Sequence, residues 1–223
     1  MSSSASPAAL SSITYTFAGV VYLSLTNRST AGLTMLAANG PGFEFPPGTG
    51  FEPLPQGYEP SAAEAAKAAL AAIDTTNADC DSSTPREVVY AGLGEPLLRL
   101  ETLCDVVQLL SKSHQVDAQR LNTNGLLPGG AGAAEQAAQM LAAAGLNSAC
   151  VQIQSGEAGQ HSELMDPSSG LGLADALEFA KQLLRAGVAV ECSVVARPEV
   201  NLELAEVLAL DIGATFKARP YYP

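Results

Sequence analysis

Cysteine is scarce in this sequence, and the few cysteines lie far apart. Cys80, Cys104, Cys150 and Cys192 are separated by 24, 46 and 42 residues. This spacing excludes a CxxC metal knuckle and a dense disulfide framework. We therefore expect ordinary reduced thiols in a cytoplasmic or organellar interior.

Positive charge and long apolar runs are also scarce. Only 11 Lys and Arg residues stand against 23 Asp and Glu residues, so the formal net charge is -12. Such a surface repels phosphate backbones and anionic lipid headgroups, which argues against nucleic-acid binding and membrane binding. No apolar run approaches the roughly 20 residues that a spanning helix needs. We therefore expect a soluble protein.

The first residues are rich in serine and uncharged, but they have neither the arginines nor the long apolar core of a targeting segment. We expect a short flexible N-terminus over residues 1–13. Hydrophobic residues make up 47% of the chain, which is enough for a substantial core. We therefore expect one α/β domain over residues 14–223.

From residue 20 onward, short apolar segments alternate with segments of helical period. Strict alternation predicts parallel strands with right-handed crossovers, in either an open doubly wound sheet or an incomplete barrel. Six strands are expected at residues 20–25, 87–90, 118–122, 149–154, 188–195 and 215–218, and five helices at residues 61–73, 97–110, 134–141, 173–184 and 202–209.

One long connection interrupts this alternation. Residues 39–60 contain six prolines, five glycines and four aromatic residues. Loops of this length are uncommon in compact domains unless they bind or cover something. A binding loop and a surface loop pinned down by its own aromatic residues are both consistent with this composition.

The segment VVYAGLGEP (residues 88–96) is an apolar strand that runs into a glycine-rich turn with one carboxylate. Glycines there permit close backbone approach, and Glu95 can bind a cationic amine. The segment resembles the GGEP-type motif of radical S-adenosylmethionine (radical SAM) proteins. Other segments of the chain occur in the same order as further motifs of that family. They are YLSLTNR (22–28), RLNTNG (120–125), VQIQS (151–155) and, near the end, FKARPYY (216–222).

As a set, these motifs resemble the small radical SAM proteins associated with the TatD nuclease family. The resemblance covers nearly the whole chain. It implies an incomplete (β/α)6 barrel of the radical SAM type with parallel strands, and it implies that Glu95 and its turn hold the amino group of S-adenosylmethionine.

The chain departs from this family at the iron-sulfur motif. In the family, the TNR phrase leads directly into CxxxCxxC, whose thiolates bind a 4Fe-4S cluster. Here the matching positions are Ser29, Leu33 and Leu36. A serine oxygen is a poor cluster ligand and leucine has no lone pair. We therefore expect neither a cluster nor radical chemistry, and we predict no catalytic residue and no metal ligand.

A pocket at the strand ends can survive this loss. Amides on apolar strands either bind a ligand or bond one another inside the barrel. Arg120 and Arg219 are expected to form structural salt bridges, and His114 and His161 to be solvated. The candidate cofactor-binding residues are Gly92, Gly94, Glu95, Asn122, Gln152 and Gln154.

Three functions remain open for such a chain. The first is a cluster-less pseudoenzyme that acts as a binding or assembly component. The second is a protein, or a non-redox enzyme, that binds S-adenosylmethionine or another amine metabolite in the retained GLGEP pocket. The third is a structural subunit of a large assembly, with residues 39–60 as its contact with a protein partner.

Overall fold

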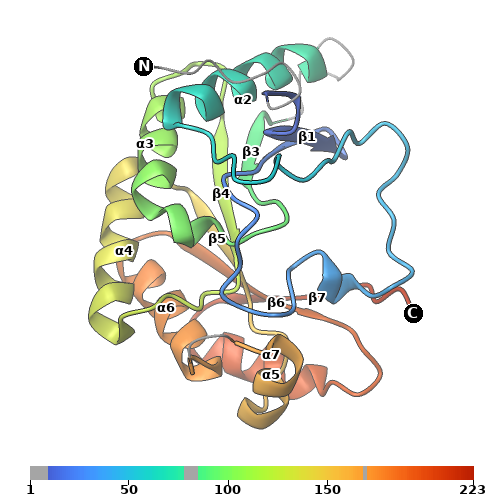
Figure 1. Cartoon of the computed structure of the whole chain (residues 1–223). Helices are drawn as coiled ribbons and strands as arrows, with labels where there is room; N and C mark the ends of the chain where they lie inside the picture. The colour runs from blue at the N-terminus through green and yellow to red at the C-terminus, as the bar shows by residue number, and fades with distance from the viewer. Residues whose placement is uncertain (1–9, 78–84, 168–169) are drawn as a thin grey trace.

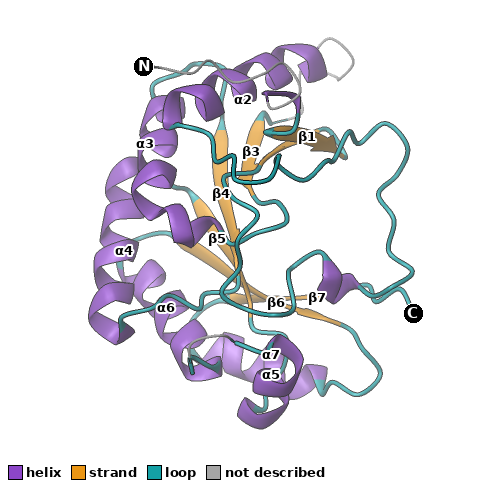
Figure 2. Cartoon of the chain, viewed as in Figure 1, coloured by secondary structure: helices purple, strands orange, loops and turns teal. Residues whose placement is uncertain are grey.

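The computed structural model describes residues 10–77, 85–167 and 170–223 of the protein. Within these ranges, seven strands form one sheet in sequence order. Figure 2 shows them as a single twisted row of arrows. The strands are β1 (Thr14–Phe17), β2 (Val20–Leu23), β3 (Glu87–Tyr90), β4 (Ala118–Thr123), β5 (Ser148–Gln152), β6 (Ala189–Val195) and β7 (Thr215–Arg219).

Helices follow most of these strands, and α2, α3, α4 and α6 lie along one face of the sheet (Figure 1). None of the helices in the described ranges is long and apolar enough to cross a bilayer. The α-helices are α2 (Ala62–Asn77), α3 (Leu100–Ser111), α4 (Gly130–Ala144), α5 (Ala158–Met165), α6 (Leu173–Arg185) and α7 (Leu202–Asp211), and two short 3-10 helices are η1 (Ala37–Asn39) and η2 (Pro96–Arg99).

Strands β2 to β7 pair in parallel along the whole sheet. Strands β1 and β7 are the two edges, so the sheet is an open, incomplete barrel rather than a closed one. The predicted six parallel strands are confirmed. The predicted helices are confirmed as well, with α5 as an additional short helix in the segment that contains HSELM.

Strand β1 was not predicted. It pairs antiparallel with β2 through a tight turn at Ala18 and Gly19, which both have positive φ. Ile13, in the segment expected to be a flexible start, is fully buried. Residues 1–9 of that segment lie outside the described residues.

The core lies between the sheet and its helices. Strand residues such as Leu23, Leu121 and Val194 meet helix residues such as Leu103 and Phe179, and all five are fully buried. Burying each side chain of this size stabilises the fold by about 1.5–3 kcal/mol. Because successive strand residues point to opposite faces, the alternate positions face the other side of the sheet, away from these helices.

Candidate functional site

The inner face of the open barrel borders a cavity of about 390 Å³. This volume lies within the usual range for small-molecule sites. Side chains from β1, β2, β4, β5, β6 and β7 reach it, and aromatic rings form much of its wall. The charged and polar strand residues are Arg120, Asn122, Cys150, Glu191, Lys217 and Arg219, and the rings are Tyr15 and Phe17 on β1, Tyr22 on β2, and Phe43, Phe45 and Tyr222 outside the strands.

The aromatic residues of the long loop pack inward. The Phe45 and Phe51 rings meet the Tyr15 ring edge-on, with centroids 5.6 and 4.9 Å away. Phe43 contacts Tyr222 near the C-terminus at 5.5 Å. Residues 39–60 are therefore pinned by their own rings, while Phe43 and Phe45 also line the cavity.

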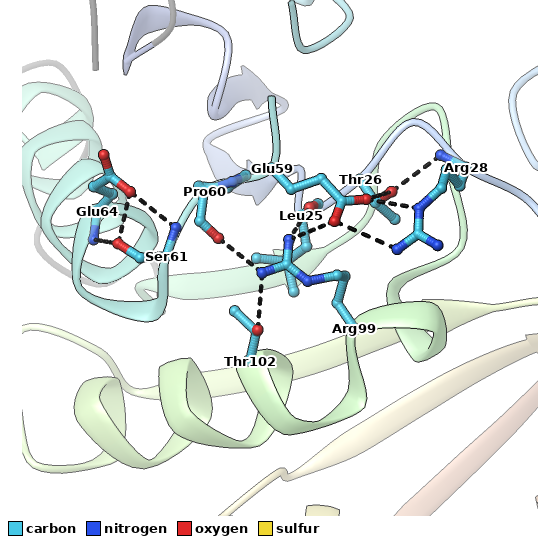
Figure 3. A network of polar contacts seen from close by, with 9 residues as sticks. All are labelled: Leu25, Thr26, Arg28, Glu59, Pro60, Ser61, Glu64, Arg99 and Thr102. Carbon is cyan, nitrogen blue, oxygen red and sulfur yellow. Dashed lines mark hydrogen bonds and ion pairs between the residues drawn. The ribbon is translucent and has the colours of Figure 1, made fainter. Parts of the chain in front are cut away.

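Glu59, near the end of this loop, binds the TNR phrase (Figure 3). Arg28 donates from Nε and Nη2 to the two carboxylate oxygens at 2.8 and 3.3 Å, and Thr26 Oγ1 donates to Oε1 at 2.6 Å. Arg99 adds an ion pair with Glu59 at 3.2 Å. The hydrogen bond from Arg28 is the main reason that the pKa of Glu59 is lowered.

The same network leads into α2. Arg99 donates to the Pro60 carbonyl and to Thr102 Oγ1, at 3.2 and 2.9 Å. Ser61 and Glu64 exchange hydrogen bonds as a capping box at the start of α2. Arg28 and its neighbours therefore hold the start of the long helix and the end of β2 together (Figure 3).

The three positions that the resemblance matches to cluster cysteines, Ser29, Leu33 and Leu36, are half-buried. Ser29 Oγ accepts a hydrogen bond from the Ala31 amide at 3.1 Å. Leu33 packs against the core, and Leu36 lines the cavity. The loop backbone pairs with the end of α5, where Leu33 N donates to the Met165 carbonyl at 3.2 Å.

The cysteines lie elsewhere in the fold. Cys150 is on β5, Cys192 on β6 and Cys104 on α3, whereas Cys80 lies outside the described residues. Burial raises the pKa of Cys104 to about 11 and that of Cys192 to about 12, so both thiols stay protonated at neutral pH. In the described part of the chain, no three His, Cys, Asp or Glu side chains are grouped so that they could hold a metal ion.

Glu95 is 3% exposed, and its carboxylate binds within the chain. Oε1 accepts hydrogen bonds from Thr123 Oγ1 and the Leu97 amide, at 2.6 and 3.1 Å, and Oε2 accepts one from the Asn124 amide at 2.9 Å. Burial raises the pKa of Glu95, although these hydrogen bonds oppose the shift. The side chain thus caps η2 and ties the turn after β3 to the end of β4.

Gly92 and Gly94 let this turn approach the end of β2. A Cβ on Gly94 would lie 2.4 Å from the Arg28 carbonyl oxygen and 2.5 Å from that of Thr26. A Cβ on Gly92 would lie 2.4 Å from Ser24 Oγ. Both glycines therefore serve close packing, and Gly92 also lines the cavity.

The three candidate amides share the inner face of the barrel. Asn122 lines the cavity, and its buried Oδ1 has no hydrogen-bond partner among the described residues. Gln152 Nε2 donates to Gln154 Oε1 at 2.8 Å. Gln152 Oε1 and Gln154 Nε2 are buried without a partner in the same ranges. The two glutamines thus bond each other, while each amide leaves one atom for a ligand or water.

Arg120 forms the expected kind of salt bridge, with Glu87 at 3.1 Å. No ion pair of Arg219 is found in the described ranges; its Nη1 donates to Asn39 Oδ1 at 3.1 Å instead. The expectation that His161 is solvated is wrong. This ring is fully buried, and its Nδ1 is 2.6 Å from the Ile153 carbonyl oxygen.

Sequence comparison finds no matching family model and no matching curated protein. Solved structures do resemble the chain. A radical SAM methyltransferase from Sphaerobacter thermophilus aligns with a TM-score of 0.62 and 17% identity, over 90% of this chain and 55% of that one. SuiB of Streptococcus suis aligns with a TM-score of 0.59 and 14% identity, over 91% and 40%.

HydG, a maturase of the FeFe hydrogenase, also aligns with a TM-score of 0.59, at 10% identity and over 91% and 42% of the two chains. At these identities the likeness establishes the fold. The chain therefore has a radical-SAM-like fold, and it spans about half the length, or less, of these solved proteins.

Proposed function

We propose that this radical-SAM-like barrel has lost cluster chemistry and acts as a binding or assembly component. One observation carries the proposal: the barrel interior keeps a cavity of about 390 Å³, while Ser29, Leu33 and Leu36 stand where the family places cluster thiolates. The scaffold is retained and the metal ligands are not. In this proposal the chain is a pseudoenzyme.

The residues present do not fit a 4Fe-4S cluster. The Ser29 hydroxyl is used as an acceptor by the Ala31 amide, and the two leucine side chains have no donor atom. Cys150 lines the cavity from β5, and burial raises its pKa. A buried protonated thiol is a poor ligand, because the thiolate is the form that binds iron.

A second candidate function is binding of S-adenosylmethionine or another amine metabolite. Ala91 and Gly92 of the GLGEP turn line the cavity, and this supports the idea. Glu95 already accepts three hydrogen bonds from within the chain. We therefore favour a ligand that depends on other groups in the cavity wall. Calorimetry with S-adenosylmethionine on the wild-type chain tests this candidate: a measurable heat of binding would support it, and no binding at millimolar ligand would contradict it.

A role as a structural subunit of a large assembly is less well supported by the geometry. The rings of residues 39–60 contact Tyr15 and Tyr222 of the same chain. These rings therefore already have contacts within the chain. A protein partner remains part of the proposal, but we place its contact surface outside residues 39–60.

Anaerobic reconstitution with iron and sulfide tests the main proposal. We expect the wild-type chain to show no charge-transfer absorbance and no bound iron after desalting. The matched control is the triple variant Ser29→Cys, Leu33→Cys and Leu36→Cys, which restores the thiolates on the same backbone and reports whether the assay loads a cluster. A stoichiometric cluster in the wild-type chain would overturn the proposal.

A further inference from the structure

The Arg219 guanidinium, at the end of β7, is anchored on one side and unpartnered on the other. Its Nη1 donates to Asn39 Oδ1, whereas Nε and Nη2 are buried with no hydrogen-bond acceptor among the described residues. Burial lowers the pKa of Arg219. Buried donors without acceptors are rare because they are costly, so a partner from outside the chain is called for.

Nε and Nη2 form the edge of a guanidinium that binds a carboxylate through two parallel hydrogen bonds. Two other arginines of this chain use that edge. Arg28 binds Glu59 with it, and Arg86 binds Asp117 at 3.0 and 2.8 Å. At Arg219 the same edge has no carboxylate within the described ranges.

The cavity that Arg219 lines is unusually basic for this protein. Three of the chain's 11 basic residues, Arg120, Lys217 and Arg219, line it, and Glu191 is the one acidic residue in its wall. Arg120 is paired with Glu87 at 3.1 Å, and Lys217 lies 3.9 Å from Glu191. Two of the three basic residues therefore have acidic partners within the chain, and the positive charge left for an anion in this wall is that of Arg219.

The rest of the wall suits an apolar body. Tyr15 and Tyr22 stack with centroids 4.9 Å apart, and Phe43, Phe45 and Leu36 stand beside them at the cavity. Asn122 adds a buried Oδ1 without a donor in the described ranges, which suits a hydroxyl or amino group on a ligand.

The geometry points to a binding site for a small carboxylate with an apolar or aromatic body, held by Nε and Nη2 of Arg219. This inference rests on the proposed function, since it names the class of ligand that the binding barrel takes. A planar carboxylate matches the two-donor edge. A phosphate dianion fits less well, because Arg120 and Lys217 are already paired with acids.

Calorimetry on the full chain tests the inference, with benzoate and phenylacetate as probes. Their neutral counterparts are benzamide and phenylacetamide, and inorganic phosphate is the third arm. We expect at least one of the two carboxylates to bind at least about tenfold more tightly than its amide, because a charge-assisted hydrogen-bond pair is lost in the amide.

Two variants test whether Arg219 causes the preference for a carboxylate over its amide. We expect Arg219→Gln to abolish this preference and Arg219→Lys to weaken it, because a lysine keeps the charge without the paired donors. The matched control is Arg185→Gln on the outer helix α6, where the side chain is 67% exposed and lies outside the cavity. Circular dichroism confirms that each variant is folded, and if Arg219→Gln does not fold, Arg219→Lys carries the test.

The inference is overturned if neither carboxylate binds, if the amides bind equally well, if phosphate binds more tightly, or if the folded Arg219 variants keep the preference. Iron uptake is a separate readout. A chain that takes up a cluster contradicts the proposed function, whereas an iron-free chain without carboxylate binding contradicts only this inference.

Discussion

Asn39 accepts a hydrogen bond from Arg219 at 3.1 Å, across 180 positions of the sequence. The Asn39 carbonyl also accepts from the Tyr222 amide at 2.8 Å. Asn39 ends η1, in the loop after β2, whereas Arg219 ends the last strand. These two contacts clamp the first and last parts of the barrel beside its cavity, and Asn39 holds the Arg219 side chain in place.

Asn39→Ala is expected to weaken benzoate binding roughly fivefold, because the guanidinium is no longer held in position before binding. Unfolding in urea should show a loss of about 1–2 kcal/mol, since Arg219 loses its acceptor. Asn201→Ala is the control: it removes the N-cap of α7 at about 1 kcal/mol and should leave benzoate affinity unchanged. Equal benzoate affinities in the wild type, Asn39→Ala and Asn201→Ala would contradict the role of Asn39 in positioning Arg219.

Gly94→Ala is expected to destabilise the fold by roughly 2–3 kcal/mol, because its Cβ would overlap backbone oxygens of Thr26 and Arg28. Gly132→Ala in α4 has open space around the new Cβ and should stabilise the fold by about 0.5–1 kcal/mol. Urea unfolding of the two variants measures both changes. Equal effects would show that the close approach after β3 is not required.

Glu95→Gln should cost about 1–3 kcal/mol, because an amide nitrogen replaces one oxygen that accepts a hydrogen bond. The raised pKa of Glu95 fixes the sign of the pH dependence. The contribution of protonated Glu95 to the free energy of unfolding is fully present below the pKa that this carboxyl has in the unfolded chain. It is lost as pH rises through the pKa that the carboxyl has in the folded protein. The cost of Glu95→Gln in urea unfolding should therefore be larger near about pH 4 than at neutral pH; the reverse order would contradict the assignment.

The exposed pair Arg86 and Asp117 offers a test by NMR. The two-donor contact from Arg86 lowers the pKa of Asp117 to about 2, so its stabilising contribution is present above the ordinary pKa and lost as pH falls through about 2. Arg86→Gln should return the Asp117 carboxyl titration to the ordinary value of 3.8. An unchanged titration would mean that the pair does not persist in solution.

Much of the fold could be predicted from local pattern. Strands such as β2, β3 and β6 were marked by short apolar runs, and helices such as α3 and α6 by their helical period. Strand β1 was missed because it lies before the alternation of strands and helices that begins at residue 20, and its antiparallel pairing with β2 depends on the turn at Ala18 and Gly19. The burial of His161 was missed because it depends on a contact with the Ile153 carbonyl after β5.

The candidate site could be predicted only in part. Gly92, Gly94 and Glu95 were identified from their motif, but the motif cannot show that the carboxylate binds Thr123 and the Asn124 amide instead of facing the cavity. Arg219 was expected to form a salt bridge. Its Nη1 instead donates to Asn39, 180 positions away, and no local pattern reveals this contact or the unpartnered Nε and Nη2.

The most direct test of the central claim is reductive cleavage of S-adenosylmethionine by the reconstituted wild-type chain. Dithionite serves as the electron donor, and released methionine is measured by mass spectrometry under anaerobic conditions. Because Ser29, Leu33 and Leu36 supply no thiolate, we expect no methionine above the protein-free control. Release of methionine in proportion to the protein added would contradict the account.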